Sequence, residues 1–186
     1  MPSGDGTPYN PSMLFFGHVG LTVAGVRAVE PEADLRAPVL FALLPDLLDK
    51  PMAFLLPHIV HGKTRSFGHS LAGAALVFAI VYVVRRRFCQ PLLLWACYAG
   101  HFLLDRMWLE PGPTILLWPY LGAFPSHLPD GPKTPHLFLY NTVGELLGLA
   151  VLLQLARRHR LHERPRWGDF VRTGRLAELP GSTFHY

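Results

Sequence analysis

The chain has 186 residues, which is enough for one domain and not comfortably for two. Half of its residues are hydrophobic and only 16% are charged, whereas soluble domains carry about 25% charged residues. This composition argues against a surface that faces water throughout and favours contact with lipid. The formal net charge of +4 does not indicate nucleic-acid binding, because the basic residues lie in short clusters beside apolar runs.

Five apolar segments predict helices. A helix that crosses the hydrocarbon core of a bilayer needs about 20 residues. The last segment meets this length, the third and fourth reach it with their flanks, and the second is too short unless it tilts or is buried among its neighbours. We therefore expect an all-α, multi-span membrane bundle of about five helices with a proline-rich outer loop; a compact bundle half sunk in the membrane is the alternative. The segments cover residues 13–29, 38–48 (extending to 56), 69–84, 91–108 and 136–156.

Three clusters of arginine orient these segments. Under the positive-inside rule all three should lie on the cytoplasmic side, and alternating spans allow this. We therefore expect residues 1–158 to form a membrane-embedded helical domain and residues 159–186 to form a polar, basic cytoplasmic tail. We predict that the protein lies in the cell inner membrane and crosses it several times. The clusters are Arg27 with Arg36, Arg85–Arg87, and the arginines of 157–160.

Ionisable side chains fall at the outward ends of these segments, on a topology that the arginines alone determine. His101 and Asp105 are four residues apart, and Asp46 and Asp49 are three apart, so each pair shares one face of a helix. Charged groups at membrane depth cost about 2.5–3.5 kcal/mol each, and a divalent cation offsets much of this cost. Glu145 has an equally good alternative role, a bond to a neighbouring helix. The pattern predicts a metal site with the ligands His18, Asp46, His69, His101, Asp105 and Glu145.

A polar loop, residues 61–70, leads into the third segment. A helix N-terminus together with Lys63 and Arg65 suits an oxyanion such as phosphate, although the two cations could also be ordinary interfacial anchors. We expect Arg65 to hold the phosphate or carboxylate of a substrate, and Asp49 to orient a water molecule or act as a general base. A ligand set of His and Asp favours zinc, with manganese or iron as alternatives.

Three strings resemble the membrane-bound metal-dependent hydrolases of the YdjM type: LLPDLLDK (43–50), HGKTRSFGHS (61–70) and GHFLLDRMWLEPGPTILLWP (100–119). The loop departs from the family pattern, because it is longer and Gly68 precedes the histidine where the family has Thr. The resemblance covers roughly residues 14 to 120 and implies a membrane hydrolase. The metal and catalytic set that it implies is His18, Asp46, Asp49, His69, His101 and Asp105.

The function expected from the sequence is hydrolysis of a phosphoester or lipid-linked substrate at the outer, extracytoplasmic face of the membrane. Bound zinc lowers the pKa of a coordinated water from 15.7 to about 7. Membrane lipid and a small-molecule or lipid substrate are the expected partners, and nucleic acid is not. One alternative is a metal-free lipid-phosphate phosphatase with a histidine nucleophile, although its lysine-and-arginine motif is missing. Others are a structural metal site and a metal transporter, and the apolar inner halves of the segments give a transporter no ion pathway.

Overall fold

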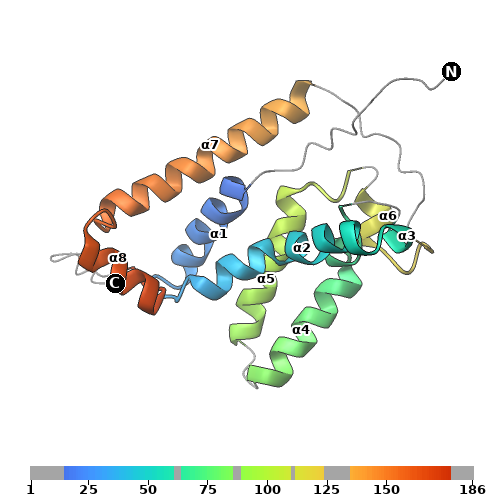
Figure 1. Cartoon of the computed structure of the whole chain (residues 1–186), viewed down its shortest axis with the longest axis horizontal. Coiled ribbons are helices and arrows are strands. Elements are labelled where there is room, and N and C mark those ends of the chain that lie inside the picture. Colours follow the sequence, from blue (N-terminus) through green and yellow to red (C-terminus); the bar gives the residue numbers. More distant parts are fainter. Residues whose placement is uncertain (1–14, 61–63, 86–88, 110–111, 124–134, 177–186) are drawn as a thin grey trace.

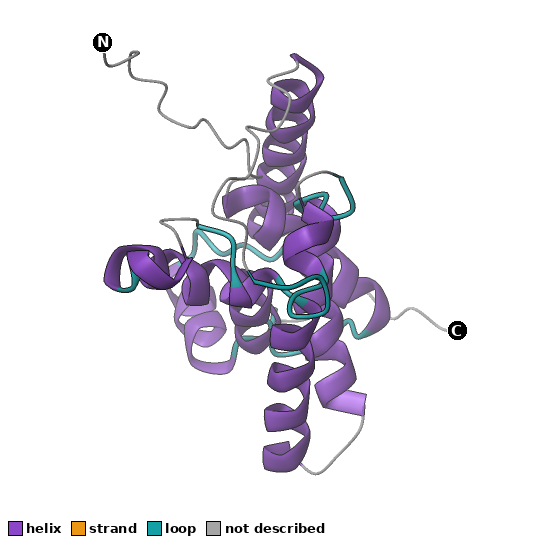
Figure 2. Ribbon diagram, turned by 90° about the vertical axis from the view of Figure 1, so that its right-hand side faces the viewer, coloured by secondary structure: helices purple, strands orange, loops and turns teal. Residues whose placement is uncertain are grey.

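A computed structural model describes residues 15–60, 64–85, 89–109, 112–123 and 135–176 of the chain. Within these ranges the fold consists of eight α-helices and one short 3-10 turn, η1, without a strand (Figure 2). The expectation of an all-α fold is therefore confirmed. The elements are α1 Phe15–Val29, α2 Arg36–Leu55, α3 Pro57–Val60, η1 Phe67–His69, α4 Leu71–Arg85, α5 Cys89–Leu104, α6 Gly112–Leu116, α7 Pro135–Arg158 and α8 Arg164–Thr173.

Helices α1 and α7 lie side by side and run in the same direction, although they come from opposite ends of the sequence (Figure 1). Gly20 and Gly148 are the points of closest approach. A Cβ atom on Gly148 would collide with the carbonyl oxygen of Phe16, and one on Gly20 would collide with the backbone of Gly148. Small residues allow two helix backbones to approach closely, as membrane helices commonly do.

The long helices α2, α4 and α5 form the rest of the helical body. Helices α4 and α5 pack against one another, and α2 crosses α5 and also contacts α1 and η1 (Figure 1). Helix α2 continues through Pro45 and Pro51, so it is longer than the apolar run of residues 38–48. This arrangement brings the first residues of α1, the middle of α2, η1 and the end of α5 to one place.

Two apolar clusters form the core, and α5 contributes to both of them. Cys97 belongs to the first cluster, whereas Tyr98 and Phe102 belong to the second. The first cluster also contains Val19, Val23, Val26, Ala33, Leu35 and Leu176, and the second contains Ala74, Met107 and Ile115.

Among the described residues, one helical stretch is long and apolar enough to cross a membrane. This stretch is Phe138–Arg158 of α7, and only 11% of its most apolar window is buried. Helices α1 and α4 are apolar but have 15 residues each, about 22 Å of rise against a hydrocarbon core of about 30 Å. The structure therefore supports one helix of spanning length, and five complete spans stay a prediction.

The segment after α7 is folded against the helical body up to residue 176. The N–H of Leu35 donates to the carbonyl of Gly174 at 2.9 Å, and Nη1 of Arg36 donates to the carbonyl of Arg172 at 2.9 Å. Phe170 packs against the first core cluster. Sequence analysis expected only a polar tail here, because scattered apolar residues give no periodic run. Residues 177–186 lie outside the described part.

The predicted outer loop is described in part. Its first half contains α6, which packs against η1, and the ring of Trp118 meets that of Phe67 edge to face at 5.9 Å between centroids. Residues 124–134 lie outside the described ranges.

Candidate metal centre

Three histidine rings converge from three separate elements. His18 lies in the first turn of α1, His69 ends η1, and His101 lies in the last turn of α5. The Nε2 atoms of His69 and His101 are 3.1 Å apart, and the ring centroids of His18 and His101 are 4.0 Å apart. All three side chains are at most 2% exposed. Residues up to 83 positions apart therefore share one buried site, as the sequence pattern predicted for these three.

Two carboxylates face the three rings. Asp105 places Oδ1 3.4 Å from Nε2 of His18, and its Oδ2 lies 3.6 Å from Nε2 of His69 and 3.8 Å from Nε2 of His101. Asp46 places Oδ1 3.8 Å from Nε2 of His69 and 4.0 Å from Nε2 of His101. The Asp46 side chain is 21% exposed and pairs with Lys50 at 2.7 Å. Asp46 thus connects the buried cluster to the surface, whereas Asp105 is buried.

These residues form two overlapping groups that could hold a metal ion. One group is His18, His101 and Asp105, the other is Asp46, His69 and His101, and the ligand atoms of each lie within 4.8 Å of one another. The two groups share His101. Because Nε2 of an imidazole has one lone pair, His101 can bind only one ion at a time. In a tetrahedral zinc site with Zn–N distances of 2.0–2.1 Å, ligand atoms are about 3.3 Å apart, which is close to the separations found here.

The tautomers of His69 and His101 show that the cluster suits a cation. Nδ1 of His101 lies 2.7 Å from the carbonyl oxygen of Ala42, and Nδ1 of His69 lies 2.7 Å from Oδ2 of Asp49. Both Nδ1 atoms therefore carry the proton, because a carbonyl or carboxylate oxygen can only accept. In the neutral rings the two Nε2 lone pairs then face one another at 3.1 Å. This contact is repulsive unless a cation or a proton lies between them.

Asp49 supports the cluster from behind. Its buried carboxylate accepts hydrogen bonds from the N–H and the hydroxyl of Ser66, from the N–H of Gly68, and from the N–H and Nδ1 of His69. Five donors therefore surround two carboxylate oxygens. A carboxylate behind a histidine is the usual partner of a metal-ligating imidazole, whose orientation and tautomer it fixes.

The His69 ring is buried, which disfavours its charged form, but the carboxylates of Asp105 and Asp49 outweigh this effect. The pKa of His69 is therefore raised. A proton and a metal ion compete for the same Nε2 atom.

The course of the loop before α4 depends on Gly68. A Cβ atom there would lie 2.6 Å from the carbonyl oxygen of Pro45 and 3.0 Å from Oδ1 of Asp49. The hydroxyl of Tyr98 donates to the carbonyl of Gly68 from the other side. A larger residue would push η1 away from α2 and move His69. This contact explains why glycine stands at a position where the resemblance led us to expect threonine.

Arg65 lies at the edge of the cluster. Its guanidinium pairs with Oδ2 of Asp105 at 2.7 Å, and its side chain is 16% exposed. It therefore joins the predicted site, placed between the buried carboxylate and the surface. Lys63, which we expected to act with it, lies outside the described residues.

Glu145 lies on α7, away from these groups, and its side chain caps the start of α1. Its two oxygens accept hydrogen bonds from the N–H groups of Phe16 and Gly17 at 3.0 and 2.8 Å. N–H groups in the first turn of a helix have no acceptor within the helix, and a carboxylate at this end also compensates the helix dipole. Neither metal-binding group of the described residues includes Glu145. It instead fixes the start of α1, one residue before His18, and this corresponds to its alternative role of binding a neighbouring helix.

The sequence did not predict two residues of the site, Ala42 and Tyr98, nor the neighbouring Arg106. Ala42 contributes a backbone carbonyl, which has no sequence signature. Tyr98 precedes His101 by three residues, so helical spacing alone would have placed it on the same face. Arg106 follows Asp105 directly; its guanidinium lies 4.4 Å from the centroid of the Tyr140 ring and 3.5 Å from Oδ1 of Asn141.

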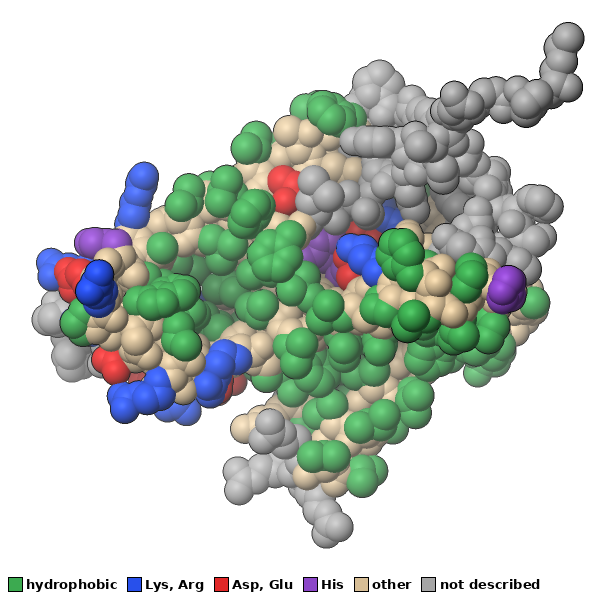
Figure 3. Space-filling model, in the orientation of Figure 1, with side chains coloured by type: hydrophobic (Ala, Val, Ile, Leu, Met, Phe, Trp, Pro, Cys, Tyr) green, Lys and Arg blue, Asp and Glu red, His purple; other side chains and the backbone are tan. Residues whose placement is uncertain are grey.

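The surface over the site is polar in an otherwise apolar region. Histidine, acidic and basic side chains gather at one place in Figure 3, and hydrophobic side chains lie beside and below it in this view. Arg65 and Asp46 supply partly exposed charges at the cluster. A charged group of a substrate would meet the cluster here.

A sequence profile of the family described as YdjM inner membrane protein matches residues 13–167 of the chain. The match includes every predicted site residue and most of the described helices. Searches of curated proteins and of solved structures gave no match.

Proposed function

The chain belongs to the YdjM inner membrane protein family, and from this premise we propose that it is a membrane-embedded metal-dependent hydrolase of phosphoester or lipid-linked substrates. The observation that carries the proposal is the pair of Nε2 atoms of His69 and His101, 3.1 Å apart with both Nδ1 protons engaged elsewhere. A divalent cation, with zinc preferred over manganese or iron, satisfies both lone pairs at once.

The chain offers both ligands and supporting groups for this chemistry. His18, His69, His101 and Asp105 would hold the ion, with Asp46 completing or bridging the shell. A bound divalent ion would polarise a substrate oxygen and make hydroxide available near neutral pH.

Three residues around the ligands would bind the substrate, accept a proton and position a ligand. Arg65 is placed to bind an anionic substrate group beside Asp105. Asp46, the carboxylate that reaches the surface, is placed to accept a proton there. Asp49, with its oxygens occupied by five donors, is assigned to positioning His69, which replaces the general-base role that we expected for it.

The proposed sidedness of the site rests on where the arginines lie. Arg27 is in the last turn of α1 and Arg157 is in the last turn of α7, whereas His18 lies in the first turn of α1. His101 lies at the end of the antiparallel α5. The cluster is thus at the opposite end of these helices from Arg27 and Arg157, and the positive-inside rule supports an extracytoplasmic site on a multi-pass protein.

A structural metal site is the second candidate, because the three imidazole rings are almost fully buried. A closed four-ligand shell serves stability alone. The partly exposed side chains of Asp46 and Arg65 favour the catalytic reading, since a closed shell needs no exposed cation beside it.

The deciding experiment is the metal content of protein purified in detergent without chelators. We expect stoichiometric zinc or manganese in the wild type, and its loss in the double variant His101→Ala, Asp105→Ala. His58→Ala is the matched control, because His58 is an exposed histidine on α3. A wild type that binds no metal would overturn the proposal and favour the metal-free phosphatase. Metal without turnover of any phosphoester or lipid phosphate would favour the structural site.

A further inference from the structure

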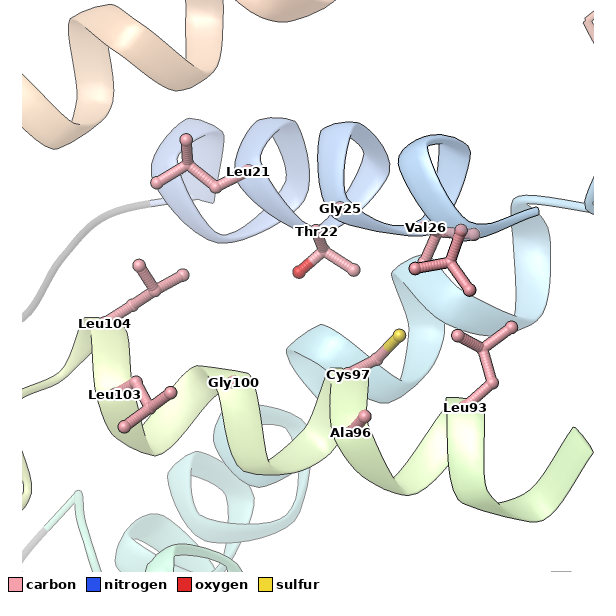
Figure 4. Close-up of a pocket in the computed structure, with 11 residues that line it drawn as sticks. Leu21, Thr22, Gly25, Val26, Leu93, Ala96, Cys97, Gly100, Leu103 and Leu104 are labelled. Atoms are coloured by element: carbon pink, nitrogen blue, oxygen red, sulfur yellow. The ribbon is translucent and has the colours of Figure 1, made fainter. Parts of the chain in front are cut away.

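An apolar groove runs along α1 and α5 with a volume of about 320 Å³ (Figure 4). Its walls are largely aliphatic, and among the labelled residues only Thr22 has a hydroxyl group. The groove is open along its side. Hydrocarbon is the ligand chemistry that fits such walls.

One end of the groove lies beside the metal cluster. Leu21 on α1 is one turn from His18, and Leu104 on α5 is one turn from His101, so on each helix a residue that lines the groove lies one turn from a histidine of the cluster. Figure 4 shows Leu21 and Leu104 at the same end of the groove. This end of the groove is therefore next to two histidines of the cluster.

Two glycines keep the groove open. A Cβ atom on Gly25 or Gly100 would meet no other atom within 4 Å, so helix packing does not require glycine at either position. Gly20 and Gly148 differ, since a Cβ atom there would strike backbone. Glycine within a helix lowers its stability relative to alanine. The open groove gives a reason for glycine at both positions.

We infer that this groove binds one hydrocarbon chain of a lipid substrate whose anionic head group lies at the metal cluster. The inference rests on the proposed function. Arg65 supplies the positive charge for the head group at the cluster end. On α5 the groove extends from Leu93 to Leu104, about 16 Å of helix. One leaflet is half of a hydrocarbon core of about 30 Å, so this length suits one chain.

The test is photolabelling in phosphatidylcholine nanodiscs with a phosphatidic acid that carries a diazirine in one acyl chain. We expect label in the peptides of α1 and α5 that line the groove. A long-chain alkyl phosphate should compete with this label, whereas glycerol phosphate and inorganic phosphate should not, because the chain supplies the recognition.

The variants Gly25→Leu and Gly100→Leu fill the groove while they favour the helix. Each should lower the groove label by about tenfold or more, the factor expected when about two methylene groups lose their apolar contacts. Gly168→Leu on α8 is the control, because a Cβ atom there also meets nothing within 4 Å. Equal metal content in all variants shows that the cluster is intact.

Label spread evenly over the exposed faces of α4 and α7 would overturn the inference, as would groove label that survives Gly100→Leu. A dimer cross-linked through the groove would overturn it as well, because a second copy would then be the occupant. A wild type that lacks metal but is labelled in the groove would refute the hydrolase and retain the chain-binding groove, so the two failures are distinguishable.

Discussion

The carboxylate of Asp49 lies 2.7 Å from Nδ1 of His69 and also accepts the backbone N–H of the same residue at 3.2 Å. One side chain of α2 therefore fixes both the ring and the backbone of the histidine in η1. The turn and the ligand are built as one unit, and a change at Asp49 should affect both.

We expect Asp49→Asn to weaken metal binding by about 10–100-fold, the usual effect of removing a group that orients a ligand. The side-chain amide that replaces the carboxylate would also point its N–H groups at the N–H donors of the loop that Asp49 now accepts. This should cost about 1–3 kcal/mol of stability. Metal titration and thermal unfolding measure the two effects. Asp46→Asn is the control, since it should reduce metal binding while leaving the hydrogen bonds of η1 in place. Full metal affinity in Asp49→Asn would contradict the positioning role.

Glu145→Ala should destabilise the protein and leave its metal content unchanged. The substitution removes the acceptor of two N–H groups at the start of α1, and loss of a helix cap costs about 0.5–2 kcal/mol. For a chain of this size this corresponds to roughly 2–4 °C in Tm per kcal/mol. Glu145→Gln, which keeps one oxygen acceptor, should lie between the wild type and the alanine variant. Loss of metal without loss of stability would restore Glu145 as a ligand.

Gly148→Ala should separate α7 from α1. The added methyl group would collide with the carbonyl of Phe16, and overpacking of this kind costs about 1–3 kcal/mol. Gly25→Ala, on α1 but facing the groove beside α5, is the matched control, because its methyl group meets open space and should be neutral or slightly stabilising. Thermal unfolding in detergent compares the two variants, and equal Tm values would show that the α1–α7 contact is looser than described.

Arg65→Gln should reduce turnover by about 10²–10³-fold, the range found when one donor to a developing negative charge is removed. The metal should remain bound, because Arg65 contacts Asp105 but offers no ligand atom. Arg65→Lys should recover part of the activity, since it keeps the charge and loses the planar geometry. Unchanged turnover in Arg65→Gln would show that Arg65 does not contribute to substrate binding or turnover.

The junction between the α1–α2 loop and the C-terminal segment should loosen in acid. Hydrogen bonds from the Arg36 guanidinium hold the pKa of Asp34 below its usual range. A carboxyl group whose pKa is lowered by folding contributes stability that is complete above its unfolded value of about 3.9 and is lost as the pH falls toward the folded value. The protection of the Leu35 N–H, which is bonded to Gly174, against hydrogen exchange, corrected for the intrinsic rate at each pH, should therefore fall below about pH 4. Asp34→Asn should exchange rapidly at every pH, and a wild type that stays protected at pH 3 would contradict this account.

The sequence predicted the parts of the site that helical spacing determines. His101 and Asp105, four residues apart on α5, do face the same cluster. Asp46 and Asp49 were predicted to share one face of a helix, with Asp46 as a metal ligand and Asp49 orienting water or acting as a general base. Asp46 faces the cluster, whereas Asp49 points into the turn of Ser66 and His69. Three-residue spacing places two side chains on one side of a helix, and the neighbouring loop then decides what each of them meets.

The remaining features depend on contacts that no local pattern encodes. The loop before α4 follows its course because Gly68 fits between Pro45 and Tyr98, and both partners come from other elements. The position of Glu145 depends on α7 packing parallel to α1. The folded segment up to Leu176 rests on isolated apolar residues, which give no periodic signal. Each of these three features depends on tertiary packing.

The packing of α7 against α1 also bears on when the site can be completed. Within this packing, the contact between Gly17 and Glu145 joins positions 128 residues apart, and ribosomes add roughly 5–20 residues per second. The helix that carries His18 therefore leaves the ribosome roughly 6–26 s before its cap exists. The other ligands are synthesised during that interval, but until α7 exists the face of α1 around Gly20 has no helix to pack against. The position of His18 thereby depends on the synthesis of α7, so a truncated product lacking α7 would retain every predicted histidine ligand and still fail to hold His18 in place.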